Sequence, residues 1–201
     1  MIDETSVSII TVLFHSGYGH TDLQAKAVAR GAASVQDAEV EMLSVLNLGE
    51  DLEGPAWIRL DLSDAIVFGC PTYMGGPSAP MKSFMDASSK RWFDLRWKDK
   101  ITAGFTTSGS HSGDKLNTLI SLAIFAAQHG MLWVSLGLKA GNNTAAGNVN
   151  DLNRLGSFLG AMAQANIDCG AEEGMLKSDL LTAEHLGRRT AEWTHRLRSA
   201  P

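Results

Sequence analysis

The loop Ser16–Thr21 joins hydroxyl, glycine and histidine residues in a pattern that suits anion binding. It follows the segment 9–14, which is apolar except for one threonine. A buried parallel strand would deliver such a loop to the carboxyl edge of a sheet. There the next helix offers unpaired N–H groups and the positive end of its dipole. The loop therefore predicts a phosphate cradle.

The composition of this loop narrows the kind of phosphate. It holds no Lys or Arg, so hydrogen bonds would hold the anion, and the lysine of a nucleotide-hydrolysing P-loop is missing. Gly17 and Gly19 lack the third glycine of the G-x-G-x-x-G dinucleotide fingerprint. The phosphate of flavin mononucleotide (FMN) fits better than either. An ordinary turn between a strand and a helix is the alternative interpretation.

Alternating strand and helix patterns surround this loop. The apolar runs predict five strands, at 7–14, 38–46, 64–69, 101–106 and 131–136. The 3.6-residue periodicity predicts helices at 22–35, 78–88, 114–129 and 178–197, with a weak helical turn at 57–60. Residues 137–174 are rich in Gly, Asn and Ala and predict a long excursion at the carboxyl edge.

Five such units predict an α/β fold. We expect a flavodoxin-like, doubly wound, five-stranded parallel sheet in the order 2-1-3-4-5, with helices on both faces. No linker or repeat divides the chain, so residues 1–201 are expected to form a single domain.

Three unusual loops, 15–21, 71–77 and 107–113, each follow a predicted strand. In a parallel sheet they meet at one edge, where ligands of open α/β sheets bind. The first loop would bind the phosphate, and the other two would flank a planar ring. Because glycine has no side chain, the glycines of these two loops would let the backbone approach that ring closely. The alternative is that these glycines only serve turns.

Net charge and cysteine content argue against a protein that binds nucleic acid, a membrane surface or a metal ion. The net charge is −5 and no block of Lys or Arg occurs, so neither nucleic acid nor a membrane surface is an expected partner. Cys70 and Cys169 have no Cys or His at metal-ligand spacing, and Cys70 is expected to be a small buried hydrophobe. The acidic start Met1–Thr5 has the wrong order for a secretory signal. We expect a cytoplasmic protein without a metal site.

Five segments in the right order carry a resemblance to a known family: Ser16–His20, Asp64–Thr72 with Gly75, Met81–Asp86, Thr107–Ser110 and His129–Met131. They lie within residues 7–137. The chain resembles the flavodoxin-fold NAD(P)H:quinone oxidoreductases of the WrbA (tryptophan-repressor-binding-protein-like) type. The resemblance implies noncovalently bound FMN, two-electron transfer from NADH or NADPH to quinones, and a homo-oligomer, commonly a tetramer built from dimers.

The resemblance also implies roles for individual residues. The implied cofactor-binding residues are Ser16, Gly17, Tyr18, Gly19, His20, Thr21, Pro71, Thr72, Tyr73, Met74, Gly75, Thr107, Ser108, Gly109, Ser110, His111 and Gly113. His129 matches a histidine close to the flavin ring, although a histidine there can also complement the helix dipole. Trp92 falls where relatives place a tryptophan that closes the pocket from a neighbouring subunit, or it is a core or interface aromatic. His129 and Tyr73 are the catalytic candidates, as groups that hydrogen-bond and protonate the quinone oxygen.

The expected reaction is a ping-pong cycle in which NAD(P)H and then a quinone use the same flavin face. Relatives often have a basic residue and an aromatic where this chain has Tyr73 and Met74, so the substrate can differ. The alternatives are a flavodoxin-type electron carrier, a general NAD(P)H-dependent FMN reductase and a flavin-sensing module. Five basic residues between Lys90 and Lys100 favour an enzyme that handles anionic nicotinamide nucleotides over the carrier.

Overall fold

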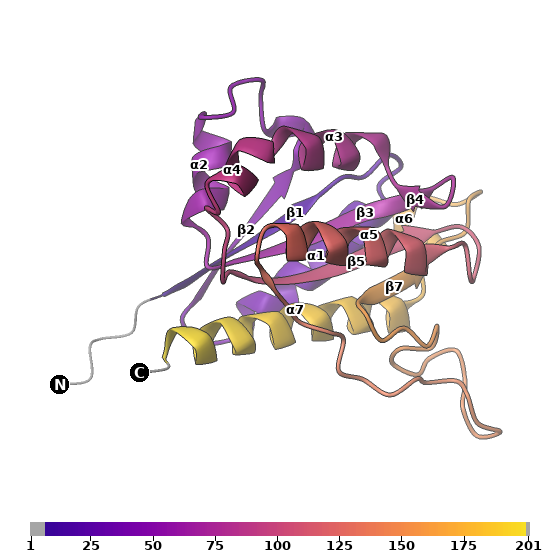
Figure 1. Ribbon diagram of the computed structural model, residues 1–201. Coiled ribbons are helices and arrows are strands. Elements are labelled where there is room, and N and C mark those ends of the chain that lie inside the picture. Colours follow the sequence, from indigo (N-terminus) through magenta and orange to yellow (C-terminus); the bar gives the residue numbers. More distant parts are fainter. Residues whose placement is uncertain (1–6, 200–201) are drawn as a thin grey trace.

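A parallel sheet forms the centre of the fold. The computed structural model describes residues 7–199, so Met1–Thr5 lies outside the described residues. The main strands are β1 (Ser8–Phe14), β2 (Ala38–Ser44), β3 (Ala65–Tyr73), β5 (Ile101–Ser108) and β6 (Leu132–Trp133). They lie in the order β2-β1-β3-β5-β6, and each neighbouring pair is parallel (Figure 1). The predicted fold class and strand order are confirmed.

The fifth position of the sheet is shared by two segments. β6 pairs with Ile101 and Thr102 at the start of β5, whereas β7 (Ala161–Gln164) pairs with the last four residues of β5. The predicted strand 131–136 is therefore wrong at 131 and 134–136, and the predicted excursion contains a strand. β7 escaped notice because Ala-Met-Ala-Gln, in a Gly- and Ala-rich stretch, lacks the β-branched residues that mark strands.

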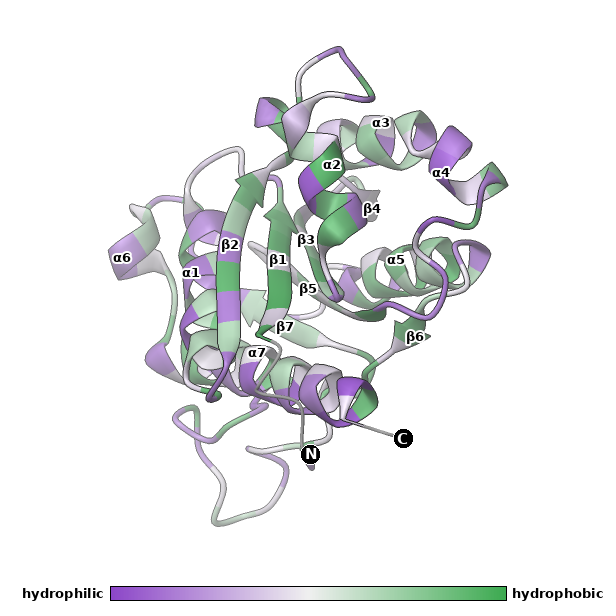
Figure 2. Ribbon diagram, turned by 90° about the vertical axis from the view of Figure 1, so that its left-hand side faces the viewer, coloured by the Kyte–Doolittle hydropathy of each residue, from purple (hydrophilic) through white to green (hydrophobic). Residues whose placement is uncertain are grey.

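Helices cover both faces of the sheet (Figures 1 and 2). One face carries α1 (His20–Ala33) and α7 (Lys177–Arg198), and the other carries α2 (Pro55–Leu62), α3 (Ala79–Ala87), α4 (Ser89–Phe93) and α5 (Lys115–Gln128). Two short elements, η1 (Val45–Asn47) and α6 (Ala171–Gly174), lie in connections. Successive strand residues point to opposite faces, so Val12 packs under α1 and α7 while Leu13 packs under the other layer.

Two glycines let α1 and α7 approach closely. A Cβ at Gly31 would lie 1.8 Å from the carbonyl oxygen of Glu184, and a Cβ at Gly187 would lie 1.9 Å from that of Val28. No side chain fits at either position without moving a backbone. This contact holds α1, whose first turn follows the predicted cradle, firmly against α7.

The connection after β3 is a hairpin rather than the open loop predicted at 71–77. β3 continues to Tyr73, and β4 (Gly76–Pro77) pairs with it antiparallel. Only two residues make the turn, Met74 at φ 47° and Gly75 at φ 81°. Both φ values are positive, as a two-residue hairpin turn of the primed type requires. The turn holds the Met74 side chain fully out in solvent.

Candidate functional site: a cofactor cleft at the carboxyl edge

The loop after β1 folds into a tight turn that leads directly into α1. Ser16 Oγ accepts a hydrogen bond of 3.1 Å from the N–H of Gly19, and Gly19 takes the left-handed conformation at φ 89°. α1 begins at His20, so the N–H groups of its first turn have no partner within the helix. The loop thus presents hydroxyl and N–H groups at the positive end of a helix dipole.

A cavity of about 590 Å³ opens in front of this loop. It is lined by Ser16, Gly17, Tyr18, His20, Thr21, Pro71, Tyr73, Thr107, Ser108, Gly109, Ala165, Ile167 and Cys169. None of these residues is Asp or Glu, so no carboxylate repels an anion. Ser16, Thr21 and Ser108 bring hydroxyl groups to its lining, and Pro71, Tyr73 and Ile167 add apolar walls. These residues fit a phosphate attached to a flat ring system.

Tyr73 closes over the cradle. A Cβ built at Gly17 would lie 2.4 Å from the Tyr73 hydroxyl oxygen, so the glycine makes room for the tyrosine. The rings of Tyr18 and Tyr73 meet edge to face, with centroids 6.4 Å apart and planes at 70°. Burial, and then the neighbouring Tyr18, raise the pKa of the Tyr73 phenol above its usual value. Tyr73 is therefore a neutral hydrogen-bond donor at neutral pH.

A second cavity, also about 590 Å³, adjoins the first. It lies between the β3–β4 turn and the loop after β5, and it is lined by Thr72, Met74, Gly75, Ser108, Gly109, Ser110, Gly113, Asn166, Ile167 and Asp168. Ser108, Gly109 and Ile167 line both cavities. The structure therefore brings the three sequence-predicted loops together on one continuous site.

Some predicted site residues use their hydroxyl groups inside the fold. Thr72 Oγ1 lies 2.8 Å from both Thr106 Oγ1 and Thr118 Oγ1, which ties β3 to β5 and α5. Thr107 Oγ1 donates to Gln24 Oε1 at 2.6 Å, which ties β5 to α1. These hydroxyl groups tie the strands and helices around the site together, and the Thr107 hydroxyl has already donated its proton within the fold.

A fourth segment, Ala165–Cys169, was missed by the sequence reasoning. Its residues contribute to both cavities, and a Cβ at Gly109 would lie 2.5 Å from Cγ2 of Ile167. The segment reaches the site because β7 is parallel to β5 and so ends at the same edge. Only recognition of β7 as a strand could have predicted this segment, and the Gly- and Ala-rich composition of the region concealed that strand.

His129 does not join this site within one chain. It caps the far end of α5, and 14 helical residues at 1.5 Å each separate it from the loop after β5 by about 20 Å. Its ring is buried, stacked on Trp97 with centroids 4.6 Å apart. Ser88 Oγ donates to the Met85 carbonyl and lies 3.0 Å from His129 Nε2, so His129 Nε2–H is the donor of that bond.

Burial lowers the pKa of His129 to about 4, so the ring is neutral at neutral pH. It therefore carries no charge with which to complement the dipole of α5.

Trp92 lies near His129. Both residues line a separate cavity of about 500 Å³ between α3, α4 and α5. Trp92 is half exposed there, and His129 forms part of the floor. In Figure 1, α4 lies near one end of the sheet, and β4 and β7 mark the other end. Any contact of these two side chains with the carboxyl-edge cleft would have to come from a different copy of the chain.

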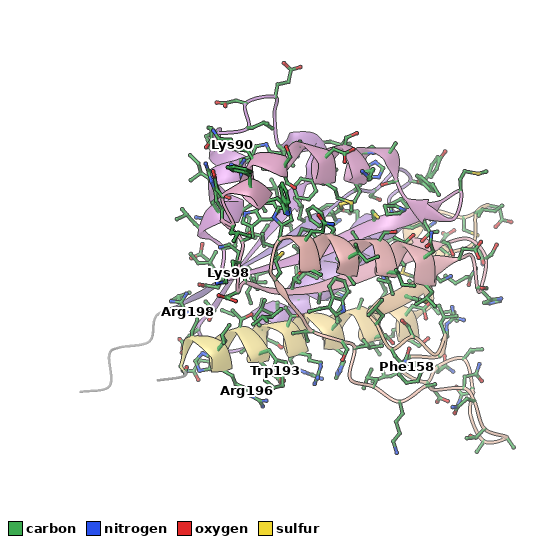
Figure 3. All side chains as sticks on the ribbon, in the orientation of Figure 1. Lys90, Lys98, Phe158, Trp193, Arg196 and Arg198 are labelled. Atoms are coloured by element: carbon green, nitrogen blue, oxygen red, sulfur yellow. The ribbon has the colours of Figure 1, made fainter. Side chains whose placement is uncertain are left out.

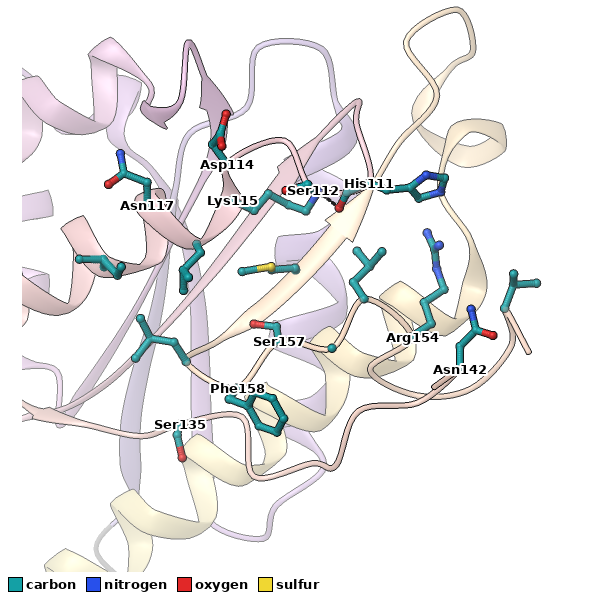
Figure 4. A pocket seen from close by; sticks show the side chains of 17 residues that line it. His111, Ser112, Asp114, Lys115, Asn117, Ser135, Asn142, Arg154, Ser157 and Phe158 are labelled. Atoms are coloured by element: carbon teal, nitrogen blue, oxygen red, sulfur yellow. Dashed lines mark hydrogen bonds between the residues drawn. The ribbon is translucent and has the colours of Figure 1, made fainter. Parts of the chain in front are cut away.

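His111 points away from the two adjoining cavities. It lines a larger groove, about 1410 Å³, between the start of α5 and the excursion that precedes β7 (Figure 4). Leu116, Ile120, Phe158 and Met162 give this groove apolar walls, and Arg154 lies in it.

The basic residues between Lys90 and Lys100 do not face the site. Arg91 and Arg96 both bind Asp61, and Arg96 also binds Glu53 and Asp94. Lys90 pairs with Glu53 as well. The cluster lies at the amino edge of the sheet, where carboxylates pair with three of its members and Lys100 donates to the carbonyls of Asp61 and Ser63. The expectation that these basic residues lie beside the flavin site of their own chain is therefore wrong.

Fold and cleft together define a class. A doubly wound sheet with a charge-poor phosphate cradle and glycine-rich loops at its switch point is typical of flavodoxin-fold flavoproteins. Residues 15–144 match the family model described as NADPH-dependent FMN reductase, and the chain belongs to this family.

Individual relatives support the same family. The chain is 43% identical to "Flavodoxin FldP" of Pseudomonas aeruginosa, over 92% of this chain and 96% of that protein. It is 33% identical to an "NAD(P)H dehydrogenase (quinone)" of Archaeoglobus fulgidus, over 94% and 98%. Among solved structures, a "flavodoxin, WrbA-like protein" from Agrobacterium tumefaciens matches with a TM-score of 0.70 and 41% identity, over 94% and 98%.

These findings confirm the WrbA-type resemblance, an FMN-dependent oxidoreductase as the enzyme class, and FMN with a nicotinamide nucleotide as its electron donor. Across residues 7–199, no helix has both the length and the apolar character to cross a bilayer.

Proposed function

We propose that the protein transfers two electrons from NAD(P)H to quinones in a ping-pong cycle. The observation that supports this best is the open, apolar mouth of the cleft. Tyr18, Met74 and Ile167 are 81%, 104% and 89% exposed around it, although all three are apolar or aromatic. Exposed apolar residues around a binding site suit planar substrates that enter and leave in turn.

FMN supplies the two-electron chemistry when it is bound. The turn Ser16–Thr21 and the start of α1 would hold its phosphate through N–H and hydroxyl groups. Backbone groups of the turn at Met74 and Gly75 would line one side of the ring. The N–H groups of the loop 108–113 would face its polar edge and favour the negative charge of the reduced form. Tyr73 would donate a hydrogen bond to the quinone oxygen.

A neighbouring copy of the chain would complete the cleft. Trp92 is a large aromatic side chain left half exposed beside the cavity that His129 lines. Aromatic residues next to arginines are enriched at protein interfaces. We therefore propose a homodimer or homotetramer in which Trp92 closes the pocket of a neighbour and neutral His129 turns its Nε2–H from Ser88 Oγ to the substrate of that neighbour. In this proposal the whole chain acts as one flavin-binding domain. The free thiols of Cys70 and Cys169 support a reducing, cytoplasmic location.

A flavodoxin-type carrier is the second candidate, because the relative from Pseudomonas aeruginosa carries the name flavodoxin. A carrier would exchange single electrons with protein partners. A general FMN reductase would instead release reduced FMN to solution. All three candidates use the same cleft. They differ in whether a quinone takes two electrons there, a protein partner takes one electron, or reduced FMN itself dissociates.

Anaerobic spectroscopy on the FMN-loaded protein separates these candidates. We expect NADH or NADPH to bleach the flavin band in one two-electron stage, and benzoquinone to restore it with the cofactor still bound. Reduction in two resolved one-electron stages with slow bleaching by both nucleotides would favour the carrier. Loss of the cofactor on reduction would favour the FMN reductase.

The catalytic assignments have their own test. We expect Tyr73→Phe and His129→Ala each to lower quinone turnover about tenfold while nucleotide-driven bleaching continues, since loss of one hydrogen bond to a reacting group costs on the order of 1.4 kcal/mol. Unchanged turnover in both variants would remove these residues from the mechanism.

A further inference from the structure

A lysine beside the third loop of the site has no role in the proposed function. Lys115 is the first residue of α5 and is completely buried. Its Nζ donates to Ser108 Oγ at 2.7 Å, to the Ser110 carbonyl at 2.7 Å and to the His111 carbonyl at 3.0 Å. All three donors of the ammonium are thereby satisfied, and all by the loop after β5. The loop folds around this one cation, which Figure 4 shows reaching from α5 toward the loop.

The charge of Lys115 is not cancelled by a direct ion pair. Among residues 7–199 no carboxylate lies within ion-pair distance of it, and its three partners are neutral oxygens. The buried acid nearby, Asp179, is held by both Arg154 Nε at 2.8 Å and Arg154 Nη2 at 2.7 Å. Asp179 also accepts the N–H of Gln164 at 2.9 Å. The Arg154–Asp179 pair is neutral as a unit, so it does not cancel the charge of Lys115.

That charge lies against the cleft. Ser108 and Ser110, which hold the ammonium, also line the cavity between the β3–β4 turn and the loop after β5, whereas Lys115 itself lines neither of the two adjoining cavities. The loop backbone therefore separates the ammonium from a bound ring. A fixed charge at such a site, shielded from water, acts more strongly than an exposed one.

We propose that Lys115 is a positioning residue that both shapes the loop 108–113 and supplies a buried positive charge favouring the reduced, negatively charged form of the bound flavin. This rests on the proposed function, in that FMN occupies the cleft. The first turn of α1 would hold the phosphate without a cation. Of the buried cations Lys115 and Arg154 at this edge, only Arg154 has a carboxylate partner, so the unpaired Lys115 would serve the electron-accepting end. Such a charge raises the midpoint potential of the cofactor and makes two-electron reduction by NAD(P)H easier.

The charge is present at neutral pH and weakens above it. Burial lowers the pKa of Lys115 to about 8, with Asp179 acting to raise it and Arg154 to lower it. Asp114 precedes Lys115 on the same turn, and the His111 ring lies in the groove beside it. The expected effect on the potential therefore fades above pH 8 in the wild-type protein.

The test compares Lys115→Gln, which can still donate to the loop, with Lys115→Arg, which keeps the charge. We expect K115Q to bind oxidised FMN with an affinity close to that of wild type. Its preference for the reduced form should fall about tenfold, a drop in midpoint potential of about 30 mV for a two-electron couple. K115R should retain the wild-type potential. Lys98→Gln, at the far edge of the molecule (Figure 3), is the matched loss of one charge and should leave the potential unchanged.

Equal potentials in K115Q and wild type, with oxidised FMN still bound, would overturn the inference. If K115Q binds no FMN, the pH dependence decides instead. The wild-type potential should fall more steeply above pH 8 than that of K115R, because arginine stays charged. Identical pH profiles would overturn the inference as well. Failure of the wild-type protein itself to bind FMN would contradict the proposed function, which separates the two failures.

Discussion

Two buried cations at opposite edges of the sheet, Arg91 and Lys115, are held in opposite ways. At the amino edge the fully buried Arg91 donates to Asp61 Oδ1 at 2.9 Å and lies 4.5 Å above the Trp57 ring. Asp61 also accepts from Trp97 Nε1 at 2.8 Å. At the carboxyl edge Lys115 meets only neutral oxygens. A cation matched inside the fold serves stability, whereas a cation left unmatched beside a cleft is available to a ligand.

The largest effect should follow from breaking the amino-edge pair. Asp61→Ala would leave the Arg91 guanidinium buried without a counter-charge, and we expect it to lower the free energy of unfolding by about 3–5 kcal/mol. Chemical denaturation measures this. The FMN affinity of the folded protein should not change, because the cluster lies at the opposite edge from the cleft.

The matched control for Asp61→Ala is Asp86→Asn, which removes one partner of the exposed Lys82–Asp86 pair. It should cost less than about 0.5 kcal/mol. A loss in Asp61→Ala as small as that of the control would show that the amino-edge cluster is not what stabilises this end of the fold.

The next effect concerns His129 and pH. The pKa of His129 is about 4 in the folded protein, against its ordinary value of 6.5. As pH falls below 6.5 the unfolded chain takes up the proton first, so stability present above pH 6.5 is lost between pH 6.5 and 4. The loss from this group is about 3 kcal/mol, at 1.36 kcal/mol per unit.

Because burial also lowers the pKa values of His15 and His185, the measurement is the difference between wild type and His129→Gln. The free energy of unfolding of His129→Gln should fall less over this pH range. Parallel curves for the two proteins would mean that His129 is not buried in the neutral form.

A smaller effect should appear at the cradle. Gly17→Ala places a methyl group against the Tyr73 hydroxyl, and we expect the dissociation constant of FMN to rise about tenfold, or about 1.4 kcal/mol. Fluorescence titration measures it. Gly170→Ala, where a Cβ would meet nothing within 4 Å, is the control and should bind as wild type does. Equal affinities in the two variants would place the cofactor elsewhere.

The sequence predicted the carboxyl edge better than the amino edge for a physical reason. Loops after parallel strands share one edge by topology alone, so finding the strands was enough to bring Ser16, Met74 and Ser108 together. What strand patterns do not contain is the pairing of side chains from distant segments. Arg91 and Asp61 are 30 residues apart, and their contact decides that the basic cluster is structural.

Two features of the site, β7 and the burial of Lys115, were not predicted because both depend on contacts between segments. β7 leads Ile167 and its neighbours to the cleft, but its four residues are few and include no β-branched residue, so the sequence does not distinguish β7 from a loop. Lys115 was counted only as part of a helix, because its burial depends on three oxygens of the preceding loop. Both features become visible only when the chain is folded.

Hydrogen exchange with and without FMN tests whether the cofactor binds at the carboxyl edge. On adding FMN, the account predicts the largest new protection in residues 15–22, 72–76, 108–113 and 165–169, the four segments of the carboxyl-edge cleft. Protection of the segments around Trp92 and His129 should be smaller and should depend on assembly of neighbouring copies. Protection confined to those two segments, with none in the four carboxyl-edge segments, would contradict the account.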